Sequence, residues 1–171
     1  MLKTKTQRPY VYFAYNKPAG QTTDTPRGLG KDVFPIGRLD KDSHGLIFLT
    51  NDGRITDRLL NPDYSHNKEY IVTTKEKLRS NFKQKMEEGV NIEGYITKKC
   101  KVKIINDFTF RIILTEGKKH QIRRMVAALF NQVCNLERVK IMNIELGNLN
   151  PRNHRAIKDE ELNTFLKSLG L

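Results

Sequence analysis

The chain begins with an aromatic run and continues as short apolar segments separated by polar, glycine-containing stretches. The run from Tyr10 to Tyr15 predicts a strand, and the polar stretch from Asn16 to Lys31 predicts a loop. The apolar run from Gly45 to Thr50 has the length of a strand, and the turn signal Asn51-Asp52-Gly53 closes it. We therefore expect a buried strand directly after the loop that contains residues 37–40.

Helical and strand periods alternate through the middle of the chain. Apolar residues at positions 55, 59 and 60 predict a helix over residues 54–61, which Pro62 ends. Asp52 lies near the start of this helix, where a negative charge stabilises the amino end. The next segments predict a strand over 69–74, an amphipathic helix over 76–88 and a hairpin over 101–115 that turns at Asn106-Asp107.

The segment from His120 to Asn131 carries an apolar stripe at the helical period, formed by Ile122, Met125, Val126 and Leu129. The basic residues of this helix project on its other faces. One or two strands over 133–146 follow, and then a helix over 159–169 with two glutamates in its first turn. The elements together predict an α+β fold with a mixed, largely antiparallel curved sheet flanked by helices.

A chain of 171 residues is long enough for one domain with a sizeable core. We predict a single domain over residues 1–171, with approximate subdomains 1–66 and 67–171. No stretch approaches the ~20 apolar residues of a membrane span, and the apolar run after the basic start is too short for a signal peptide. These features predict a cytoplasmic protein that does not enter a membrane.

Two cysteines and four histidines are present, without the spacing of a disulfide framework or a zinc site. We expect Cys100 and Cys134 to be buried, unreactive thiols, and we expect no metal. His120 is the most suggestive histidine, and its position predicts that it caps or borders a helix.

The charge is strongly positive, since 31 Lys and Arg residues face 19 Asp and Glu residues and give a formal net charge of +12. Eight basic and two acidic side chains fall within residues 117–155, so the positive charge is concentrated. This balance indicates a polyanionic partner, nucleic acid before membrane. A basic ribosome-associated or highly soluble protein would show the same charge.

Individual residues that could carry chemistry each have a structural explanation as well. Asp40 in the loop Gly37-Arg38-Leu39-Asp40 could be a turn aspartate that pairs with Arg38 or Lys41. Tyr70 could belong to the core. Arg123 and Arg124 could lie on a solvated helix face.

In combination and in this order, the motifs resemble those of the pseudouridine synthase family, in particular its RsuA branch, which acts on ribosomal RNA. The motifs are Asn16-Lys17-Pro18, GRLDKDSHGLIFLTNDG (37–53), Lys68-Glu69-Tyr70, EGKKHQIRRM (116–125) and Leu146-Gly147-Asn148-Leu149. The resemblance implies the catalytic fold of that family, with a central cleft, and a cofactor-free isomerisation of uridine to pseudouridine in RNA. The RluE-like members are the most similar, because only about nine residues precede the first predicted strand.

The resemblance implies three catalytic residues: Asp40 as nucleophile, Tyr70 as the ring that stacks on the flipped-out base, and Arg123 as the cation beside Asp40. The chemistry is consistent, because an aspartate with an ordinary pKa of about 3.9 is ionised at neutral pH and attacks without a separate base. Burial raises the pKa of a carboxylate unless a cation compensates. A uridine inside folded RNA must be flipped out, and aromatic stacking offsets that cost.

The remaining roles concern the RNA and the pocket. Arg38 matches an arginine that fills the position vacated by the flipped base, and Ile122 and Met125 would close the pocket with apolar surface. The predicted RNA contacts are Arg38, Lys68, Lys118, Lys119, Gln121, Arg124, Arg138 and Lys140. Asp42 and Asp52 are rival carboxylates that we rank below Asp40, and the segment 150–155 departs from the family pattern, so Arg155 receives no role.

The RluE-like architecture predicts ribosomal RNA of the large subunit as substrate and a monomeric enzyme without cofactor. Small-subunit ribosomal RNA and transfer RNA remain open. Two other classes are a non-catalytic RNA-binding or ribosome-assembly factor with the same fold, and a basic RNA hydrolase. The hydrolase would call for a paired carboxylate, a metal or a placed histidine, none of which the sequence indicates.

Overall fold

The computed structural model describes residues 8–171, so residues 1–7 of the predicted domain lie outside the described part. The helices are α1 (Ile55–Leu60), α2 (Phe82–Glu88), α3 (Gln121–Ala128) and α4 (Asp159–Ser168), with a short 3-10 helix at Pro62–Tyr64. The strands are β1 (Tyr12–Lys17), β2 (Phe34–Ile36), β3 (His44–Thr50), β4 (Lys68–Thr74), β5 (Asn91–Ile92), β6 (Tyr95–Ile96), β7 (Lys101–Ile104), β8 (Thr109–Leu114), β9 (Val133–Ile141), β10 (Ile144–Glu145) and β11 (His154–Ala156).

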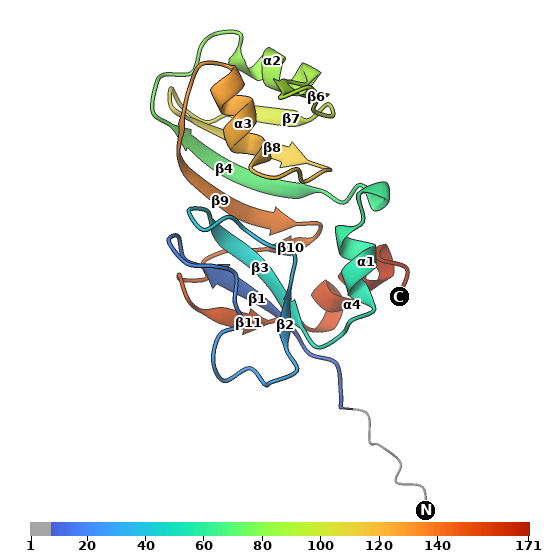
Figure 1. Cartoon of the computed structure of the whole chain (residues 1–171). Helices are drawn as coiled ribbons and strands as arrows, with labels where there is room; N and C mark the ends of the chain where they lie inside the picture. Colours follow the sequence, from blue (N-terminus) through green and yellow to red (C-terminus); the bar gives the residue numbers. More distant parts are fainter. Residues whose placement is uncertain (1–7) are drawn as a thin grey trace, which may run out of the picture.

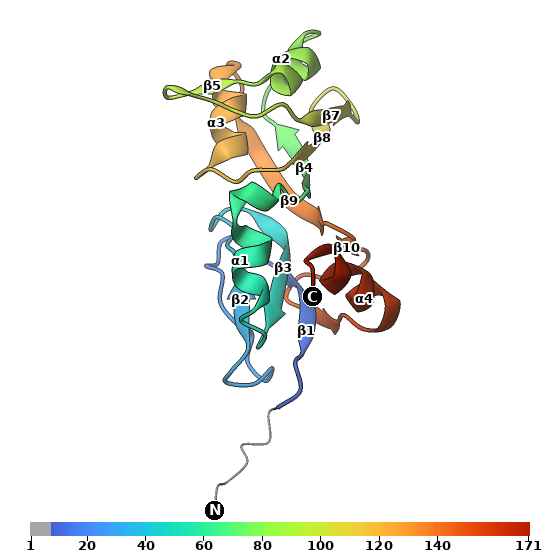
Figure 2. The ribbon, with the colours of Figure 1, turned by 90° about the vertical axis from the view of Figure 1, so that its right-hand side faces the viewer.

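One sheet runs through the molecule in the order β11-β1-β3-β9-β4-β8-β7, with β2 beside β3 and β10 beside β9 (Figure 1). Among the strands of residues 8–171, β3 and β9 form the one parallel pair of this sheet, and its other pairs are antiparallel. Helices α2 and α3 lie beside the upper part of the sheet, and α1 and α4 beside the lower part (Figures 1 and 2). The predicted mixed, largely antiparallel sheet flanked by helices is confirmed.

The two parts of the sheet meet at a narrow junction. Strands β3 and β9 pair only at His44 with Glu137 and at Gly45 with Arg138. A Cβ atom at position 45 would lie 2.3 Å from the Arg138 carbonyl oxygen, and Gly45 has a φ of +106°. Only glycine tolerates both conditions, so Gly45 makes the close approach of the two strands possible.

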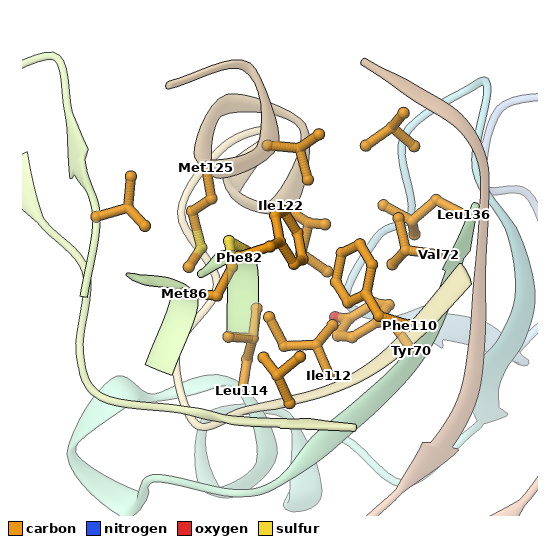
Figure 3. Packing of buried hydrophobic residues seen from close by; sticks show 14 of the residues in the cluster. Tyr70, Val72, Phe82, Met86, Phe110, Ile112, Leu114, Ile122, Met125 and Leu136 are labelled. Atoms are coloured by element: carbon orange, nitrogen blue, oxygen red, sulfur yellow. The ribbon is translucent and has the colours of Figure 1, made fainter. Parts of the chain in front are cut away.

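Buried residues form one large cluster on each side of this junction. The Tyr70 cluster lies in the upper part and includes Tyr70, Phe82, Phe110 and Met125 (Figure 3). The Phe48 cluster combines residues before position 60 with residues after position 140, because Phe165 of α4 stacks on Phe48 of β3 at 4.7 Å. The C-terminal residues therefore pack with the N-terminal part, and the clusters do not follow the predicted subdomain bounds.

Several predicted elements have different bounds in the structure. Strand β1 extends through Asn16 and Lys17, which we had expected in a loop, because both pair with β3. The helix predicted from Glu76 begins only at Phe82, because the backbone of Lys75 and Leu78 bonds to other segments. The short strands β2, β5, β6 and β11 were not predicted.

The cysteine prediction was wrong for one of the two thiols. Cys134 is exposed, whereas Cys100 is partly buried and its burial raises its pKa to about 11. Cys134 is exposed because it stands at an outward position of β9, after buried Val133. Within residues 8–171, no helix has the length and apolar character needed to cross a membrane.

Candidate active site

A cleft of about 700 Å³ opens beside the β3–β9 junction, within the size range of sites that bind small molecules or single nucleotides. Its walls come from the loop before β3, the start of β4, the end of β8, the start of α3 and the middle of β9. Ten of the predicted site residues line it: Arg38, Asp40, Lys68, Tyr70, Lys118, Lys119, Gln121, Ile122, Arg123 and Arg138. Residues far apart in the sequence are thus brought to one surface.

The loop that contains Asp40 is held by backbone contacts from the preceding polar stretch. The Gly20 N–H donates to the Lys41 carbonyl at 2.7 Å. The Thr23 hydroxyl bonds both the N–H and the carbonyl of Leu39, at 3.1 and 3.2 Å. The stretch predicted as a plain loop therefore fixes the backbone on both sides of Asp40.

Lys17 also holds this loop in place. No role was assigned to Lys17 from the sequence. Only 1% of this residue is exposed, and its ammonium donates to the carbonyls of Pro18, Lys41 and Ser43 at 2.9, 3.4 and 2.7 Å. Burial lowers the pKa of Lys17, and the nearby carboxylates of Asp40 and Asp42 partly oppose this shift. Lys17 is thus a buried cation within electrostatic range of Asp40.

The Asp40 carboxylate itself is partly exposed and directed to the cleft. Its side chain is 37% exposed, and His120 Nε2 lies 3.3 Å from Oδ1. His120 directly precedes α3 in the left-handed conformation, with a φ of 51°, and its side chain makes no capping hydrogen bond. The expected position at the helix start is confirmed, but the imidazole contacts Asp40 and does not cap the helix.

Arg123 lines the cleft but does not pair with Asp40 in this structure. Its Nη2 donates to the Ser43 hydroxyl at 3.0 Å, and no ion pair joins it to Asp40 among the described residues. The cation that the resemblance implies beside Asp40 is thus bonded to Ser43 in this structure, and its role toward Asp40 stays a prediction. Ser43 follows Asp40 in the same turn, where its N–H bonds the Asp40 carbonyl at 3.0 Å, so Arg123 still holds the Asp40 loop.

Tyr70 belongs both to the core and to the cleft wall. It is 9% exposed and packs in the Tyr70 cluster (Figure 3). It also lines the cleft. On β4 it pairs with Ile112 of β8 and with Arg138 of β9. The core interpretation and the site interpretation therefore apply to one side chain.

Two neighbouring cations, Lys68 and Arg138, lie at the cleft wall next to Tyr70. Arg138 is 5% exposed; its Nε donates to the Leu46 carbonyl at 2.8 Å, and its buried Nη2 has no hydrogen-bond partner within residues 8–171. Burial lowers the pKa of Lys68, and the charge of Arg138 lowers it further. In the described part of the chain, neither residue forms an ion pair with a carboxylate. An anion bound here would compensate both charges.

The segment before α3 is anchored by Glu116. This carboxylate is buried and accepts hydrogen bonds from the Tyr95 hydroxyl, from the Lys98 N–H at 2.8 Å and from the Gln121 amide at 2.8 Å. Burial alone would raise the pKa of Glu116, but these hydrogen bonds lower it below its usual value. The Gln121 amide oxygen also accepts from the Lys118 N–H, so Gln121 positions the segment and presents no free amide to RNA.

Three predicted site residues do not line the cleft. Arg124 bonds to Glu93 and to the Ile92 carbonyl, and Lys140 bonds to Glu145 at 3.0 Å. Met125 is fully buried in the Tyr70 cluster (Figure 3). Within residues 8–171, no group of three or more His, Cys, Asp or Glu side chains is arranged to hold a metal ion.

Comparison with family models identifies the family of the chain. The model described as RNA pseudouridylate synthase matches residues 11–128, which include Lys17, Asp40, Tyr70 and Arg123. The chain belongs to this family. The match covers the β3–β9 junction only in part, since β9 begins after residue 128.

Curated relatives extend the match over almost the whole chain. It is 41% identical to the dual-specificity RNA pseudouridine synthase RluF of Escherichia coli K12, over 98% of this chain and 61% of that protein. It is 38% identical to the ribosomal small subunit pseudouridine synthase A of Pasteurella multocida, over 81% of this chain and 61% of that protein. The chain thus spans about three fifths of these relatives, at 61% of each. The resemblance to the RsuA branch is confirmed, whereas the RluE-like subtype stays a prediction.

A solved structure supports the same assignment. A crystal structure titled pseudouridylate synthase superposes with a TM-score of 0.86 at 29% sequence identity, covering 96% of this chain and 75% of that one. The fold described above is thus that of a pseudouridine synthase.

Proposed function

We propose that this chain isomerises uridine to pseudouridine in ribosomal RNA, with Asp40 as the nucleophile. The observation that carries the proposal is a partly exposed carboxylate on a tightly held loop, in a cleft that also presents an aromatic ring and several cations. Family membership supplies the reaction type. The position of Asp40 at the cleft supports its assignment within that reaction.

The reaction needs no redox step and no external group. The bond between ribose C1′ and uracil N1 breaks, and the Asp40 carboxylate forms a temporary covalent bond to the sugar or to the base. The base then turns, a bond forms between C1′ and C5, and the bond to Asp40 breaks and returns the free carboxylate. The proton at C5 leaves, and N1 gains a proton. Tyr70 is placed to stack on the flipped base at the cleft wall, and Ile122 contributes apolar surface that limits water access.

Three groups hold Asp40 ready for attack in this proposal. Lys17 fixes the backbone of the loop through two of its carbonyls. Arg123 holds Ser43, and His120 contacts the Asp40 carboxylate itself at 3.3 Å. We assign His120 as a positioning residue, in the place beside Asp40 where the sequence interpretation had put the cation Arg123. Movement of Arg123 from Ser43 to Asp40 on RNA binding would bring that cation to the carboxylate.

The RNA backbone would meet cations on both sides of the flipped base. Lys68 and Arg138 have no carboxylate to compensate them in the described structure, so a phosphate is the natural counterion. Lys118, Lys119 and Arg38 also line the cleft; the two lysines would contact further phosphates, and Arg38 would fill the vacated stack. Gln121, Arg124 and Lys140 have partners within the protein, and we leave them out of the proposed contact set.

Ribosomal RNA is the proposed substrate because the relative from Pasteurella multocida is a ribosomal small subunit pseudouridine synthase and the motifs resemble the RsuA branch. Within ribosomal RNA, the RluE-like resemblance favours the large subunit. A cytoplasmic location and a monomeric state complete the proposal. The net charge of +12 favours direct association with RNA.

The test is to incubate the purified chain with separate transcripts of large- and small-subunit ribosomal RNA and to map pseudouridines in both. We expect a new pseudouridine at one or a few positions of the large-subunit RNA. Modification of the small-subunit RNA alone would overturn the subunit preference and leave the reaction intact. Absence of pseudouridine in both transcripts, with a related enzyme active on the same RNA, would contradict the proposed function.

A further inference from the structure

Phe130 combines two unfavourable features at one position beyond the cleft. Its side chain is 77% exposed, the highest value among the exposed large hydrophobic residues of the described chain. Its φ of 62° lies in the left-handed region, where a bulky residue is strained and glycine or asparagine is not. A left-handed residue commonly ends a helix and is usually glycine, so a strained phenylalanine with an exposed ring at this place indicates a role for the ring outside the fold's own packing.

The turn that carries Phe130 is firmly held. The Phe130 N–H donates to the Ala127 carbonyl at 3.0 Å, and the Asn131 N–H donates to the Val126 carbonyl at 3.1 Å. The Asn131 side chain bonds both the N–H and the carbonyl of Glu76, at 3.0 and 2.9 Å. The backbone that carries the ring is therefore held in place at the end of α3.

A basic segment with a second exposed phenylalanine beyond it adjoins this ring. The Arg79 guanidinium carbon lies 5.5 Å from the centre of the Phe130 ring. The segment 75–79 bonds to the Phe130 turn on one side, through the Lys75 N–H and the Gln132 carbonyl at 2.8 Å. On the other side, the Leu78 N–H bonds the Asp107 carbonyl at 2.7 Å. The exposed Phe108 follows Asp107, so two phenylalanines flank the basic segment.

We define these exposed residues as the distal tip: Lys75, Lys77, Arg79, Phe108 and Phe130. Two acidic residues adjoin it. Asp107 pairs with Lys77 at 2.9 Å, and Glu76 is exposed beside Lys75. Among residues 8–171, Lys75 and Arg79 form no ion pair with a carboxylate. Figure 1 shows the chain after β4, the turn after α3 and the β7–β8 turn at the same end of the sheet.

An exposed aromatic ring beside an arginine and a lysine matches the chemistry of unpaired nucleic acid bases. Aromatic side chains stack on any base, guanidinium groups stack and bind phosphate, and lysine adds phosphate attraction. A protein partner would be expected to call for a larger apolar patch. Helix α3 joins the tip to the cleft, and its eight residues span about 12 Å, so one RNA strand could reach both.

We propose that the distal tip is a second RNA site, where an unpaired base near the target uridine stacks on Phe130 with Arg79 and Lys75 at its phosphates. This inference rests on the proposed function, because it takes RNA as the partner. In this proposal, the strained backbone of Phe130 exposes the ring so that a base can stack on it. Removal of the ring should therefore stabilise the protein while weakening its grip on RNA.

The test compares the unaltered full chain with Phe130→Gly and Phe130→Tyr. The probes are two fluorescent oligouridylates, one of about four and one of about 16 nucleotides, which bracket common single-strand site sizes. Phe130→Gly should melt at a higher temperature and bind the long oligomer roughly five- to hundredfold more weakly, the loss of one stacked base. Phe130→Tyr should keep the affinity. Ile96→Ala removes another exposed apolar side chain, at 68% exposure, and should leave the affinity unchanged.

Each result decides between the proposals. If Phe130→Gly binds the long oligomer as tightly as the unaltered chain, the tip is not an RNA site, and the proposed reaction is unaffected. If Phe130→Gly melts at a lower temperature, the ring stabilises the fold and the inference is overturned. If the unaltered chain binds neither oligomer and modifies no ribosomal RNA, the proposed function fails and the inference fails with it.

Discussion

The two ends of strand β3 carry aspartates in opposite situations. Asp52, after the strand, is fully buried and accepts hydrogen bonds from the Tyr12 hydroxyl at 2.7 Å and from the backbone and guanidinium of Arg54. Asp40, before the strand, is 37% exposed, and within residues 8–171 its carboxylate has one recorded polar partner, His120 at 3.3 Å. The first carboxylate is saturated by its own protein, whereas the second retains acceptor capacity that faces a cleft.

This difference separates a structural acid from a candidate nucleophile. Burial alone would raise the pKa of Asp52, but the hydrogen bonds from Arg54 and Tyr12 lower it below its usual value. The same burial and the Asp52 charge raise the pKa of Tyr12 to about 12. The hydrogen bonds at Asp52 thus stabilise its ionised carboxylate. At Asp40 the surrounding contacts hold the backbone and leave the carboxylate available.

The largest expected effect follows from Asp40→Asn. The variant should lose pseudouridine formation by at least about 10⁴-fold, because the amide cannot replace the carboxylate nucleophile. Its melting temperature should stay within a degree or two of the parent. The assay is release of tritium from RNA labelled at uridine C5.

Asp42→Asn is the matched control for this variant, since Asp42 is the exposed neighbouring aspartate of the same loop. It should retain activity. Equal losses in both variants would assign the effect to the charge of the loop as a whole and would remove the special role of Asp40.

The opposite end of β3 should respond in stability. Asp52→Asn should lower the free energy of unfolding by about 2 kcal/mol at neutral pH, because a buried carboxylate with charged and hydroxyl donors is lost. A lowered folded-state pKa contributes stability above the unfolded pKa of about 3.9, and this contribution disappears as pH falls through the folded value. The difference between parent and variant in urea unfolding should therefore shrink below about pH 4. A difference that is constant down to pH 2.5 or so would contradict this origin.

His120 allows the positioning contact to be separated from backbone strain. His120→Gly removes the imidazole and relieves the left-handed backbone, so the protein should be as stable as the parent or more so. Its kcat should fall roughly 10- to 100-fold with little change in KM, because Asp40 loses its partner. His120→Asn tolerates the same backbone and should recover part of the activity.

A purely structural role for His120 predicts another pattern. The glycine variant would then equal the parent in kcat, and the asparagine variant would show no advantage over it. That pattern would remove His120 from the proposed site and leave Asp40 held by Lys17 and Arg123 alone.

The smallest effect on function is expected from two lysines that line the cleft, Lys118 and Lys119. Combined Lys118→Ala and Lys119→Ala substitutions should weaken RNA binding and make its salt dependence shallower, by about 0.7 to 0.9 in the log-log slope for each lost phosphate contact. Lys118 also lies 4.6 Å over the Tyr95 ring. Lys158→Ala, an exposed lysine before α4, is the control. An unchanged slope in the double variant would place the RNA elsewhere.

The sequence predicted the long elements well, because their apolar spacing carries the information. It did not reveal β5, β6 or β11, each two or three residues long, since tertiary pairing and not periodicity forms them. Lys17 shows the limit most clearly. A polar Asn-Lys-Pro segment indicates a loop, and only folding brings the three carbonyls that satisfy a buried ammonium.

The sequence predicted most of the residues that line the candidate site, but not which of them contact one another. Ten predicted residues line one cleft, because the motifs fall on the edges that face the β3–β9 junction. The exchange of Arg123 for His120 beside Asp40 depends on a left-handed residue before α3 and on the Ser43 hydroxyl. Neither feature leaves a periodic signal in the sequence. Met125 was wrongly predicted to line the pocket, because the apolar stripe of α3 to which it belongs faces the core.

The central claim, that Asp40 and not Asp52 performs the reaction, is tested most directly in ribosomal RNA from cells that carry this protein. Its own copy would be replaced by the parent, Asp40→Asn or Asp52→Asn sequence at matched protein levels, and pseudouridines would be mapped. We expect the target to remain uridine only in the cells with Asp40→Asn. Pseudouridine at the target in the Asp40→Asn cells would contradict it.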